Sequence, residues 1–582
     1  MVKTLMGQIK EYKKVSILTP VFTSLEVFME VLIPFITSAL IDQGIQKGDM
    51  GKIYFYGGIM LAIAMLSLLF GILAGKYAAN ASSGFACNLR NAMYDNIQTF
   101  SFSNIDKFST AGLVTRMTTD VTNVQNSYQM CLRIAVRAPL MLVCSLVMCF
   151  LINVQLSLVF VVAIAVLACG LIFIMKGAIK IFDVVFKKYD ALNASVQENV
   201  TAIRVVKAFV REDFENKKFT HAANELYKLF VKAESILAFN SPIMMFVIYG
   251  CVTALSWFGA NFIIAGNLTT GELTSMFTYI MSIMMSLMIL SMIFVMITMS
   301  AASGRRIAEV INEKPDIVNP ENPVMEIKDG SIDFNHVNFH YKHANDKETL
   351  TDIDLHIKSG ETIGIIGGTG SGKSSLVNLI SRLYDVASGS VYVGGRDVRE
   401  YDIEELRNQV AVVLQKNVLF SGSILDNLRW GKEDATEEEC IEVCRQACAD
   451  EFIEQFPDKY NTHIEQGGSN VSGGQKQRLC IARALLKSPK VLILDDSTSA
   501  VDTATDSKIR ESFAKKIPGV TKIIIAQRVS SIENADRIIV IDDGKICGFD
   551  THKNLMETNK IYREIYDTQV KGGGDFDQPS KD

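Results

Sequence analysis

The sequence predicts two parts of different class, an α-helical membrane bundle of six spans and then a soluble α/β domain. Two observations indicate this. The first 310 of the 582 residues hold 43 charged side chains, whereas the remaining 272 hold 78. Apolar runs long enough to cross a bilayer fall in the first part. The chain is therefore not one soluble globule, and a net charge of −5 argues against a nucleic-acid-binding protein.

Uncharged stretches locate the spans. Residues 53–75 carry no charge, and 23 residues of helix reach about 35 Å, enough for a hydrocarbon core of about 30 Å. The uncharged stretch 138–175 is too long for one span, so we expect a hairpin that turns at Asn153-Val154-Gln155. The last apolar stretch is divided by a turn at 266–271, just before Glu272. The predicted spans are about 15–41, 53–80, 132–152, 156–178, 240–265 and 272–304.

The connections between the spans alternate in length. Three are short, whereas residues 80–131 and 179–239 read as helix, so we expect long helical extensions beyond the bilayer. Basic residues favour the side of these extensions; they are Lys3, Lys10, Lys13, Lys14, Lys187, Lys188, Arg204, Lys207, Arg211, Lys217 and Lys218. The positive-inside rule then places both termini, both long loops and the soluble domain in the cytoplasm, with the chain crossing the cytoplasmic membrane several times.

Two features inside the spans are candidates for substrate contact. Glu26 and Glu30 lie one turn apart on the first span, where an ionised carboxylate is costly unless it is paired or faces water. They are candidates to attract a cationic substrate, and a structural pairing with a neighbouring helix or a hydrated cavity is the alternative. The sixth span carries a stripe of flexible thioethers, for which lipid contact or helix packing is the alternative to a binding wall. The stripe comprises Met281, Met285, Met288, Met292, Met296 and Met299.

Three closely spaced prolines mark the boundary between the two parts. Pro315, Pro320 and Pro323 predict a linker over 311–325, because prolines without an apolar period interrupt regular structure. The membrane part then covers 1–310, the soluble domain 326–570, and a tail over 571–582 is predicted to be disordered.

A phosphate-binding loop opens the chemistry of the soluble domain. A buried-strand pattern over 361–366 precedes a GxxxxGK[ST] motif, and an apolar helix follows it, which is the context that a P-loop requires. Backbone N–H groups of such a loop surround phosphate oxygens, Lys373 reaches the β- and γ-phosphates, and the Ser374 hydroxyl ligates Mg²⁺. The predicted ATP-binding residues are Gly367, Gly368, Thr369, Gly370, Ser371, Gly372, Lys373, Ser374 and Ser375.

A second acidic element supports nucleotide binding. The apolar strand 490–494 ends in Asp495, a usual way to hold a carboxylate at a sheet edge as a partner of Mg²⁺.

A third motif carries a family resemblance. Val471-Ser472-Gly473-Gly474-Gln475 resembles the LSGGQ signature of the ATP-binding cassette (ABC) transporters, and the resemblance extends over nearly the whole chain. It implies that Tyr341 stacks on adenine, that Gln415 senses Mg²⁺, and that the stretch ending at Asp502 is the D-loop. Residues 108–120 and 203–209 look like the two coupling loops of multidrug-type exporters.

The resemblance also implies an assembly. In this family ATP lies between the P-loop of one cassette and the signature of another, so Ser472, Gly473, Gly474 and Gln475 are expected to bind the γ-phosphate of a nucleotide held by a second half. One cassette per chain therefore predicts a dimer, in which closure of the cassettes moves the coupling loops and turns the bundle outward.

Two positions depart from the family pattern. Asp496 stands where the family usually has the glutamate that polarises the attacking water, and Gln527 stands where it usually has a histidine at the γ-phosphate. The shorter carboxylate and the neutral amide both weaken catalysis, since a shift of about 1 Å can cost on the order of 10²-fold in rate.

These departures predict a site that holds ATP and Mg²⁺ but hydrolyses ATP poorly. The hypothesis is an ATP-driven exporter half for amphipathic small molecules, drug-like or lipid-like, that pairs with a different, catalytically intact half. The alternatives are a homodimeric lipid flippase, a siderophore importer with the exporter fold, and an ATP-gated regulatory or channel subunit.

Overall fold

The computed structural model describes residues 1–342, 348–496 and 501–571. Part of the predicted D-loop, Ser499 and Ala500, and the predicted tail from 572 onward lie outside the described residues. The chain forms two compact units. The first comprises Met1–Gln98 and Ala111–Glu313, and the second comprises Thr99–Thr110 and Lys314–Asp582.

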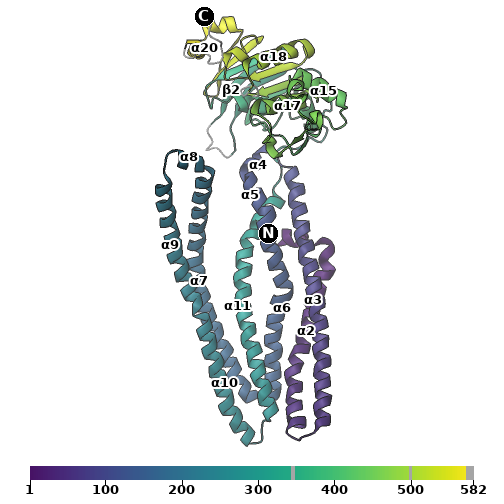
Figure 1. The fold of residues 1–582 in the computed structure, drawn as a ribbon, viewed down its shortest axis with the longest axis vertical. Helices are drawn as coiled ribbons and strands as arrows, with labels where there is room; N and C mark the ends of the chain where they lie inside the picture. Colours follow the sequence, from purple (N-terminus) through teal and green to yellow (C-terminus); the bar gives the residue numbers. More distant parts are fainter. Residues whose placement is uncertain (343–347, 497–500, 572–582) are drawn as a thin grey trace. The chain divides into compact units, whose positions relative to one another are not determined.

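The first unit is built of helices (Figure 1). They are α1 (Val2–Gly7), α2 (Lys13–Leu40), α3 (Met50–Gln98), α5 (Thr110–Thr115), α6 (Val121–Ile152), α7 (Val154–Thr201), α8 (Ile203–Ala208), α9 (Glu212–Ala238), α10 (Asn240–Ile264) and α11 (Thr270–Asn312). Six helical segments of the described chain are long and apolar enough to cross a membrane, which confirms the predicted six-span bundle.

Several of these helices run well past the predicted spans. Helix α3 has 49 residues, which at 1.5 Å each makes about 74 Å, more than twice the thickness of a hydrocarbon core. Helix α7 has 48 residues, and α9 extends the fifth span on its N-terminal side, before α10 begins. Helix α11 ends at Asn312, two residues into the predicted linker. The expected long helical extensions are therefore present.

The turns between spans are fixed by local capping. Asn153 leaves helical geometry (φ −154°, ψ 114°), and its side chain accepts a hydrogen bond from the Leu156 N–H, which starts α7. Thr269 and Glu272 form a capping box at the start of α11. The Asp42 carboxylate also accepts the Gly271 N–H at 2.9 Å, so the turn after α2 is tied to the first residues of α11.

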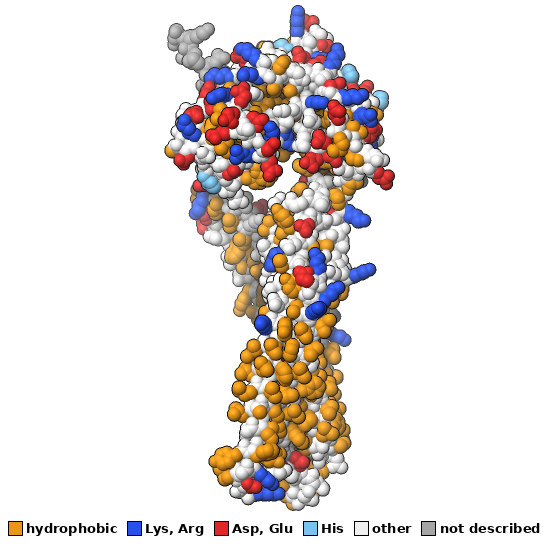
Figure 2. Space-filling model, turned by 90° about the vertical axis from the view of Figure 1, so that its right-hand side faces the viewer, with side chains coloured by type: hydrophobic (Ala, Val, Ile, Leu, Met, Phe, Trp, Pro, Cys, Tyr) orange, Lys and Arg blue, Asp and Glu red, His pale blue; other side chains and the backbone are white. Residues whose placement is uncertain are grey.

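The helices pack around a buried apolar core and expose an apolar surface. Val31, Phe160, Leu255 and Tyr279 are almost fully buried, and the Tyr279 hydroxyl donates to the Val31 carbonyl at 2.7 Å. Figure 2 shows hydrophobic side chains over a broad band of the helical unit, with few charges among them. Such a band is stable against lipid but not against water.

The second unit is an α/β domain with a six-stranded main sheet. The strand order is β12-β11-β3-β10-β9-β6, parallel except for the β11–β12 pair. These strands are β3 (Thr362–Gly367), β6 (Val410–Val413), β9 (Val491–Asp495), β10 (Thr521–Ile525), β11 (Arg537–Asp542) and β12 (Lys545–Asp550). Two helices matter for the site because each starts at a strand or loop that carries a motif: α12 (Lys373–Ile380) and α17 (Gly473–Leu485).

Two smaller sheets and further helices complete the unit. The antiparallel sheet β2-β1-β4-β5 contains β1 (Ile332–Phe339), β2 (Leu350–Ile357), β4 (Ser388–Val393) and β5 (Arg396–Asp397), and β7 (Gly422–Ser423) pairs with β8 (His463–Ile464). The other helices are α4 (Phe102–Phe108), α13 (Ile403–Gln409), α14 (Ile424–Arg429), α15 (Glu437–Gln446), α16 (Asp450–Ile453), α18 (Thr503–Lys516), α19 (His552–Thr558) and α20 (Lys560–Lys571).

Helix α4 belongs to this second unit although it comes from the membrane half of the sequence. The Tyr384 hydroxyl and the Asp106 carboxylate are 2.7 Å apart, and the Ser103 hydroxyl donates to Asp316 at 2.8 Å. The Asn104 amide donates to the Lys314 carbonyl. The segment Thr99–Thr110 is thus held by the cassette and by the start of the linker.

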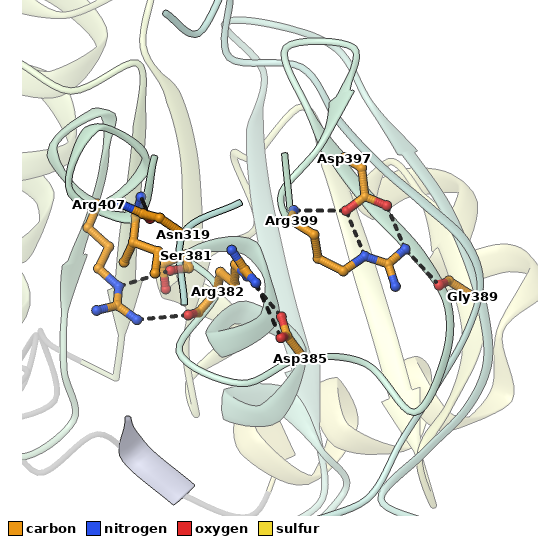
Figure 3. A network of polar contacts seen from close by, with 9 residues as sticks. Asn319, Ser381, Arg382, Asp385, Gly389, Asp397, Arg399 and Arg407 are labelled. Atoms are coloured by element: carbon orange, nitrogen blue, oxygen red, sulfur yellow. Dashed lines mark hydrogen bonds and ion pairs between the residues drawn. The ribbon is translucent and has the colours of Figure 1, made fainter. Parts of the chain in front are cut away.

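Arginine side chains make two separate groups of polar contacts in this unit, one of them just after the P-loop helix α12 (Figure 3). Arg382, 6% exposed, donates to Asp385 at 3.0 Å, and Arg407 of α13 donates to the Arg382 carbonyl at 2.9 Å. Arg399 holds Asp397 through two hydrogen bonds of 2.9 and 2.6 Å. The Arg407 contact ties the segment after α12 to α13, whereas the Arg399 contacts lie within the β4–β5 hairpin and the residues that follow it.

Candidate functional site

The P-loop follows β3 at the carboxyl end of the parallel strands. Gly370 and Gly372 have φ of +81° and +100°, a left-handed backbone that glycine adopts without strain. At Gly367 a Cβ would come within 2.1 Å of the Ile541 carbonyl oxygen, so no larger residue fits there. The chain therefore curls tightly before α12 begins at Lys373.

The loop lines a cavity of about 620 Å³. The structure brings most of the predicted ATP-binding and catalytic residues together around it: Tyr341, Gly367, Gly368, Thr369, Gly370, Ser371, Gly372, Lys373, Ser374, Ser375, Gln415, Asp495, Asp496 and Gln527. The other residues that line this cavity, which sequence reasoning did not identify, are Thr349, Ile366, Ile525, Ile565 and Gln569.

Lys373 lies over the loop that it follows. Its ammonium group donates to the carbonyls of Gly367 and Gly368 at 3.0 and 2.7 Å. Burial lowers the pKa of Lys373, and the nearby Asp495 and Asp496 carboxylates oppose that shift. The ammonium group thus lies beside the loop backbone and two carboxylates, and Lys373 lines a cavity that is large enough for phosphate groups.

Asp495 and Ser374 supply two oxygen groups of the kind that coordinate a magnesium ion. The Ser374 hydroxyl donates to Asp495 Oδ1 at 3.1 Å. Burial raises the pKa of Asp495, while the Ser374 hydrogen bond lowers it. Hard cations such as Mg²⁺ prefer hydroxyl and carboxylate oxygens, so this pair, with the Gln415 amide on the same cavity wall, fits the ion.

Two further observations fit a nucleotide. The Ser371 hydroxyl oxygen is buried and has no hydrogen-bond partner among the described residues, as expected for a group that faces a phosphate. The Tyr341 ring stands at 88° to the Tyr384 ring, and its hydroxyl is 2.9 Å from the Ser375 hydroxyl. Tyr341 therefore forms an aromatic wall beside the start of α12.

The two departures from the family pattern contact one another. The Gln527 amide donates to Asp496 Oδ2 at 2.7 Å, and both side chains line the cavity. Asp496 follows β9 with a φ of +49°, while Gln527 follows β10, the neighbouring strand. Parallel pairing of Asp495 with Ile525 brings the two strand ends level and so puts these side chains within reach.

Gln569 of α20 is a site residue that sequence reasoning missed. Its amide donates to the Gln527 carbonyl at 2.7 Å, and its oxygen accepts the Val529 N–H at 2.8 Å. The side chain thus clamps the loop after β10. It lies 42 positions from Gln527, and an isolated glutamine on an amphipathic helix has no local signal of such a role.

The signature residues do not line this cavity. Ser472 caps α17: its hydroxyl accepts the Gln475 N–H at 3.3 Å, and Gln475 accepts the Ser472 N–H at 2.9 Å. Gly473 and Gly474 form the exposed to half-buried first turn of this 13-residue helix. Asp502 likewise caps α18 through the Thr505 N–H at 2.9 Å, and hydrogen bonds from Thr505 lower its pKa.

In the membrane half, Glu26 and Glu30 share one arginine. Arg137 of α6 contacts Glu26 at 2.5 Å and Glu30 at 2.7 Å. The pairing matches the structural alternative stated for these glutamates. Arg137 was not identified from the sequence, because the ion pairs span 107 and 111 positions.

The methionine stripe lies on the outside of α11. Met281, Met285, Met288 and Met292 are exposed within this chain, and Met296 is half-buried. The side chain of Met299 lies outside the described residues.

Comparison with known proteins assigns the family. Residues 16–288 match the family of the ABC transporter transmembrane region, and residues 350–499 match the ABC transporter family. The uncharacterized ABC transporter ATP-binding protein YfiB of Bacillus subtilis is 35% identical over 561 residues, covering 96% of this chain and 97% of that protein. The chain belongs to the ABC transporters.

Other relatives agree. An uncharacterized ABC transporter ATP-binding protein of Mycobacterium tuberculosis is 34% identical over 570 residues, covering 97% of each chain. The ATP-dependent lipid A-core flippase of Syntrophus aciditrophicus is 32% identical over 488 residues, covering 83% of this chain and 80% of that one. The structure of a bacterial Atm1-family ABC exporter with ATP bound shares the fold, with a TM-score of 0.81 at 22% identity, over 96% of this chain and 99% of that one.

The architecture is that of a half-transporter, in which one membrane domain is fused to one nucleotide-binding domain. It is a multi-pass membrane protein with an exporter-type fold. The ABC ATPase domain implies ATP binding, typically with Mg²⁺, and hydrolysis coupled to transport.

Proposed function

We propose that this chain is one half of a heterodimeric exporter and that its own nucleotide site binds Mg²⁺-ATP but hydrolyses it slowly. The observation that carries the proposal is the hydrogen bond from Gln527 to Asp496. The residues expected to hold the nucleotide line one cavity, whereas Asp496, at the position that polarises the attacking water, and Gln527, at the position that contacts the γ-phosphate, bond to one another.

The Asp496–Gln527 pair is poorly suited to catalysis for two reasons. An aspartate reaches one methylene less far than a glutamate, and an error of about 1 Å in placement can lower the rate on the order of 10²-fold. Its Oδ2 already accepts the Gln527 amide, so a water molecule has to compete for that oxygen. Gln527 is neutral and gives less stabilisation to charge that develops on the γ-phosphate than an imidazolium does.

The signature supports a second role for this chain. Ser472 is already shaped as a helix N-cap, and the N–H groups of the first turn of α17 point an electropositive helix end outward. Because these residues do not line the chain's own cavity, we assign them to the nucleotide held by a partner half. That second site would be the active one.

The cargo that we propose is an amphipathic small molecule. The exposed thioethers of Met281, Met285, Met288 and Met292 offer a flexible, polarizable wall on α11 that adapts to varied apolar shapes. The Glu26–Arg137–Glu30 group adds charge at one place in the bundle.

The ATPase rate of the purified full-length chain in lipid nanodiscs tests the proposal. The wild-type chain alone is expected to turn over slowly. The double variant Asp496→Glu with Gln527→His restores the longer carboxylate and the imidazole, and its rate should rise by about 10-fold or more.

The same double variant carrying Lys373→Ala serves as the control, because it removes the phosphate-binding ammonium and should abolish the gain. Robust turnover by the wild-type chain alone, unchanged in the double variant, would contradict the slow site and would favour a homodimer.

One observation favours a second candidate, a homodimeric lipid flippase. The relative named as a lipid A-core flippase aligns over both domains of this chain. Lipid translocation by the chain alone, with ATPase activity stimulated by the same lipid, distinguishes this function from the heterodimer.

A further inference from the structure

Three charged side chains form a group inside the membrane bundle. Arg137 of α6 donates through Nη1 to Glu26 Oε1 at 2.5 Å. Its other terminal nitrogen, Nη2, donates to both oxygens of Glu30, at 2.7 and 2.8 Å. Glu26 and Glu30 lie one turn apart on α2, 14 and 10 residues before that helix ends at Leu40, so the group lies at membrane depth.

The group is one positive charge short. Two carboxylates share one guanidinium, which leaves a formal charge of −1 where charge is costly. The contacts agree with this shortage: Glu26 Oε2 is buried and has no hydrogen-bond partner among the described residues, and the Glu26 side chain is only 8% exposed. A buried carboxylate oxygen without a donor indicates a missing partner.

Within the described part of the chain, the neighbours of the group do not supply that partner. Gly71 of α3 packs on the carboxylate, since a Cβ there would come within 3.1 Å of Glu26 Oε1. Arg133, one turn before Arg137, lies against Gly75 instead, 3.7 Å from where its Cβ would be. In the part of the chain that the structure describes, no ion pair joins Arg133 to either glutamate.

The three side chains of the group differ in exposure. The Glu30 and Arg137 side chains are 27% and 34% exposed, against 8% for Glu26. An incoming cation therefore meets Glu30 first. If it takes over the Glu30 oxygens, Arg137 is released to turn both terminal nitrogens to Glu26 and to satisfy Oε2.

We propose that Glu26, Arg137 and Glu30 form a binding site for one protonated amine of a membrane-soluble amphiphile. The ammonium brings the charge of the group to zero and donates N–H hydrogen bonds, which a quaternary ammonium cannot do. This inference names a class of molecule for the proposed export of amphipathic molecules. It rests on that proposed function only where the bound amine is taken to be the transported cargo. A lipid headgroup amine has the same chemistry as a free amphipathic amine.

Binding is measured on the full chain in phosphatidylcholine nanodiscs without nucleotide, by fluorescence titration with dansylcadaverine. Its N-acetyl and N-trimethyl derivatives supply a neutral and a quaternary comparison. We expect the wild type to bind the amine at least about tenfold more tightly than either derivative. Glu26→Gln and Glu30→Gln should each abolish that preference, and Glu30→Asp should retain part of it.

Two further variants separate charge from structural damage. Arg137→Gln leaves two unpaired carboxylates and should bind the amine more tightly, whereas mere damage would weaken binding. Glu272→Gln keeps the capping box of α11, because glutamine also serves there, and should bind as the wild type does.

The source of the amine is resolved by lipid composition. If phosphatidylethanolamine in the nanodiscs competes with dansylcadaverine in the wild type, a headgroup occupies the site; if it does not, a free amphiphile is the ligand. Folded Glu26→Gln and Glu30→Gln variants, with elution and thermal unfolding like the wild type, that keep the amine preference would overturn the assignment. Because this titration contains no nucleotide, a negative result would not bear on the slow ATPase site. Equally, a fast ATPase rate would not bear on amine binding.

Discussion

Two carboxylates that follow one another at the end of β9 have different partners. Asp495 accepts the Ser374 hydroxyl, whereas Asp496 accepts the Gln527 amide. The first contact can be exchanged for a magnesium ion, because both of its oxygens are ligands that Mg²⁺ accepts. In the function that we propose, the second contact occupies the oxygen that would activate water. Adjacent residues would then separate nucleotide binding from hydrolysis.

Ser374→Ala tests the magnesium position. Loss of the hydroxyl removes one oxygen ligand, so the affinity for ATP in the presence of Mg²⁺ should fall by about tenfold. Affinity without Mg²⁺ should change little, since the Ser374 backbone N–H remains. Titration of a fluorescent ATP analogue with and without Mg²⁺ measures both.

Ser390→Ala, a serine of β4 away from the cavity, is the matched control. An equal loss for Ser374→Ala with and without Mg²⁺ would show that the hydroxyl does not serve the metal.

Most of the residues that line the cavity belong to motifs that local sequence specifies. A strand, a glycine loop and a helix in immediate succession leave few ways to place Lys373 and Ser374, and an apolar strand ending in a carboxylate places Asp495 at the same sheet edge. Arg137 and Gln569 were not predicted. Their partners are 111 and 42 positions away, and nothing in the flanking residues specifies those contacts.

At the level of elements, α20 (Figure 1) holds the loop after β10. Gln569 bonds to both the Gln527 carbonyl and the Val529 N–H, so the backbone that carries the Gln527 side chain is fixed from outside the motif. The sequence did not predict that α20, a helix close to the predicted C-terminal tail, contributes to the nucleotide site.

Gln569→Ala should loosen that loop. The loss of the bond to the Val529 N–H, at about 1 kcal/mol, should speed amide exchange in the 527–531 segment by about fivefold. Hydrogen–deuterium exchange with mass spectrometry measures it. Thr568→Ala on the same helix is the control, because the Thr568 hydroxyl bonds only within α20, to the Glu564 carbonyl. Equal exchange in Gln569→Ala and wild type would show that α20 does not restrain the loop.

For the membrane bundle, uncharged stretches predicted the number of spans but not the ends of the helices. Charge-free runs and short polar breaks predicted the number of spans, because a lipid environment imposes both length and composition. They did not predict where the helices end, since α3 and α7 continue far beyond the apolar part of their sequences. A helix outside the membrane is not an uncharged stretch, so the distribution of charge does not mark where it ends.

Each of the two domains contains a site that lacks a group it is expected to need. The cassette holds a nucleotide pocket whose signature lies elsewhere, and the bundle holds two glutamates that share one arginine. We propose that partners complete both sites: a second half-transporter for the cassette, and an amine for the glutamates.

The identity of the nucleotide that the chain retains distinguishes a slow nucleotide site from an active one. The purified full-length chain is incubated with radiolabelled ATP and Mg²⁺, separated from free nucleotide by rapid filtration, and its bound nucleotide is resolved chromatographically. We expect ATP to remain the main bound species over minutes on the wild-type chain, and ADP to replace it on the variant with Asp496→Glu and Gln527→His. Rapid appearance of ADP on the wild-type chain alone would contradict a site that binds ATP without hydrolysing it efficiently.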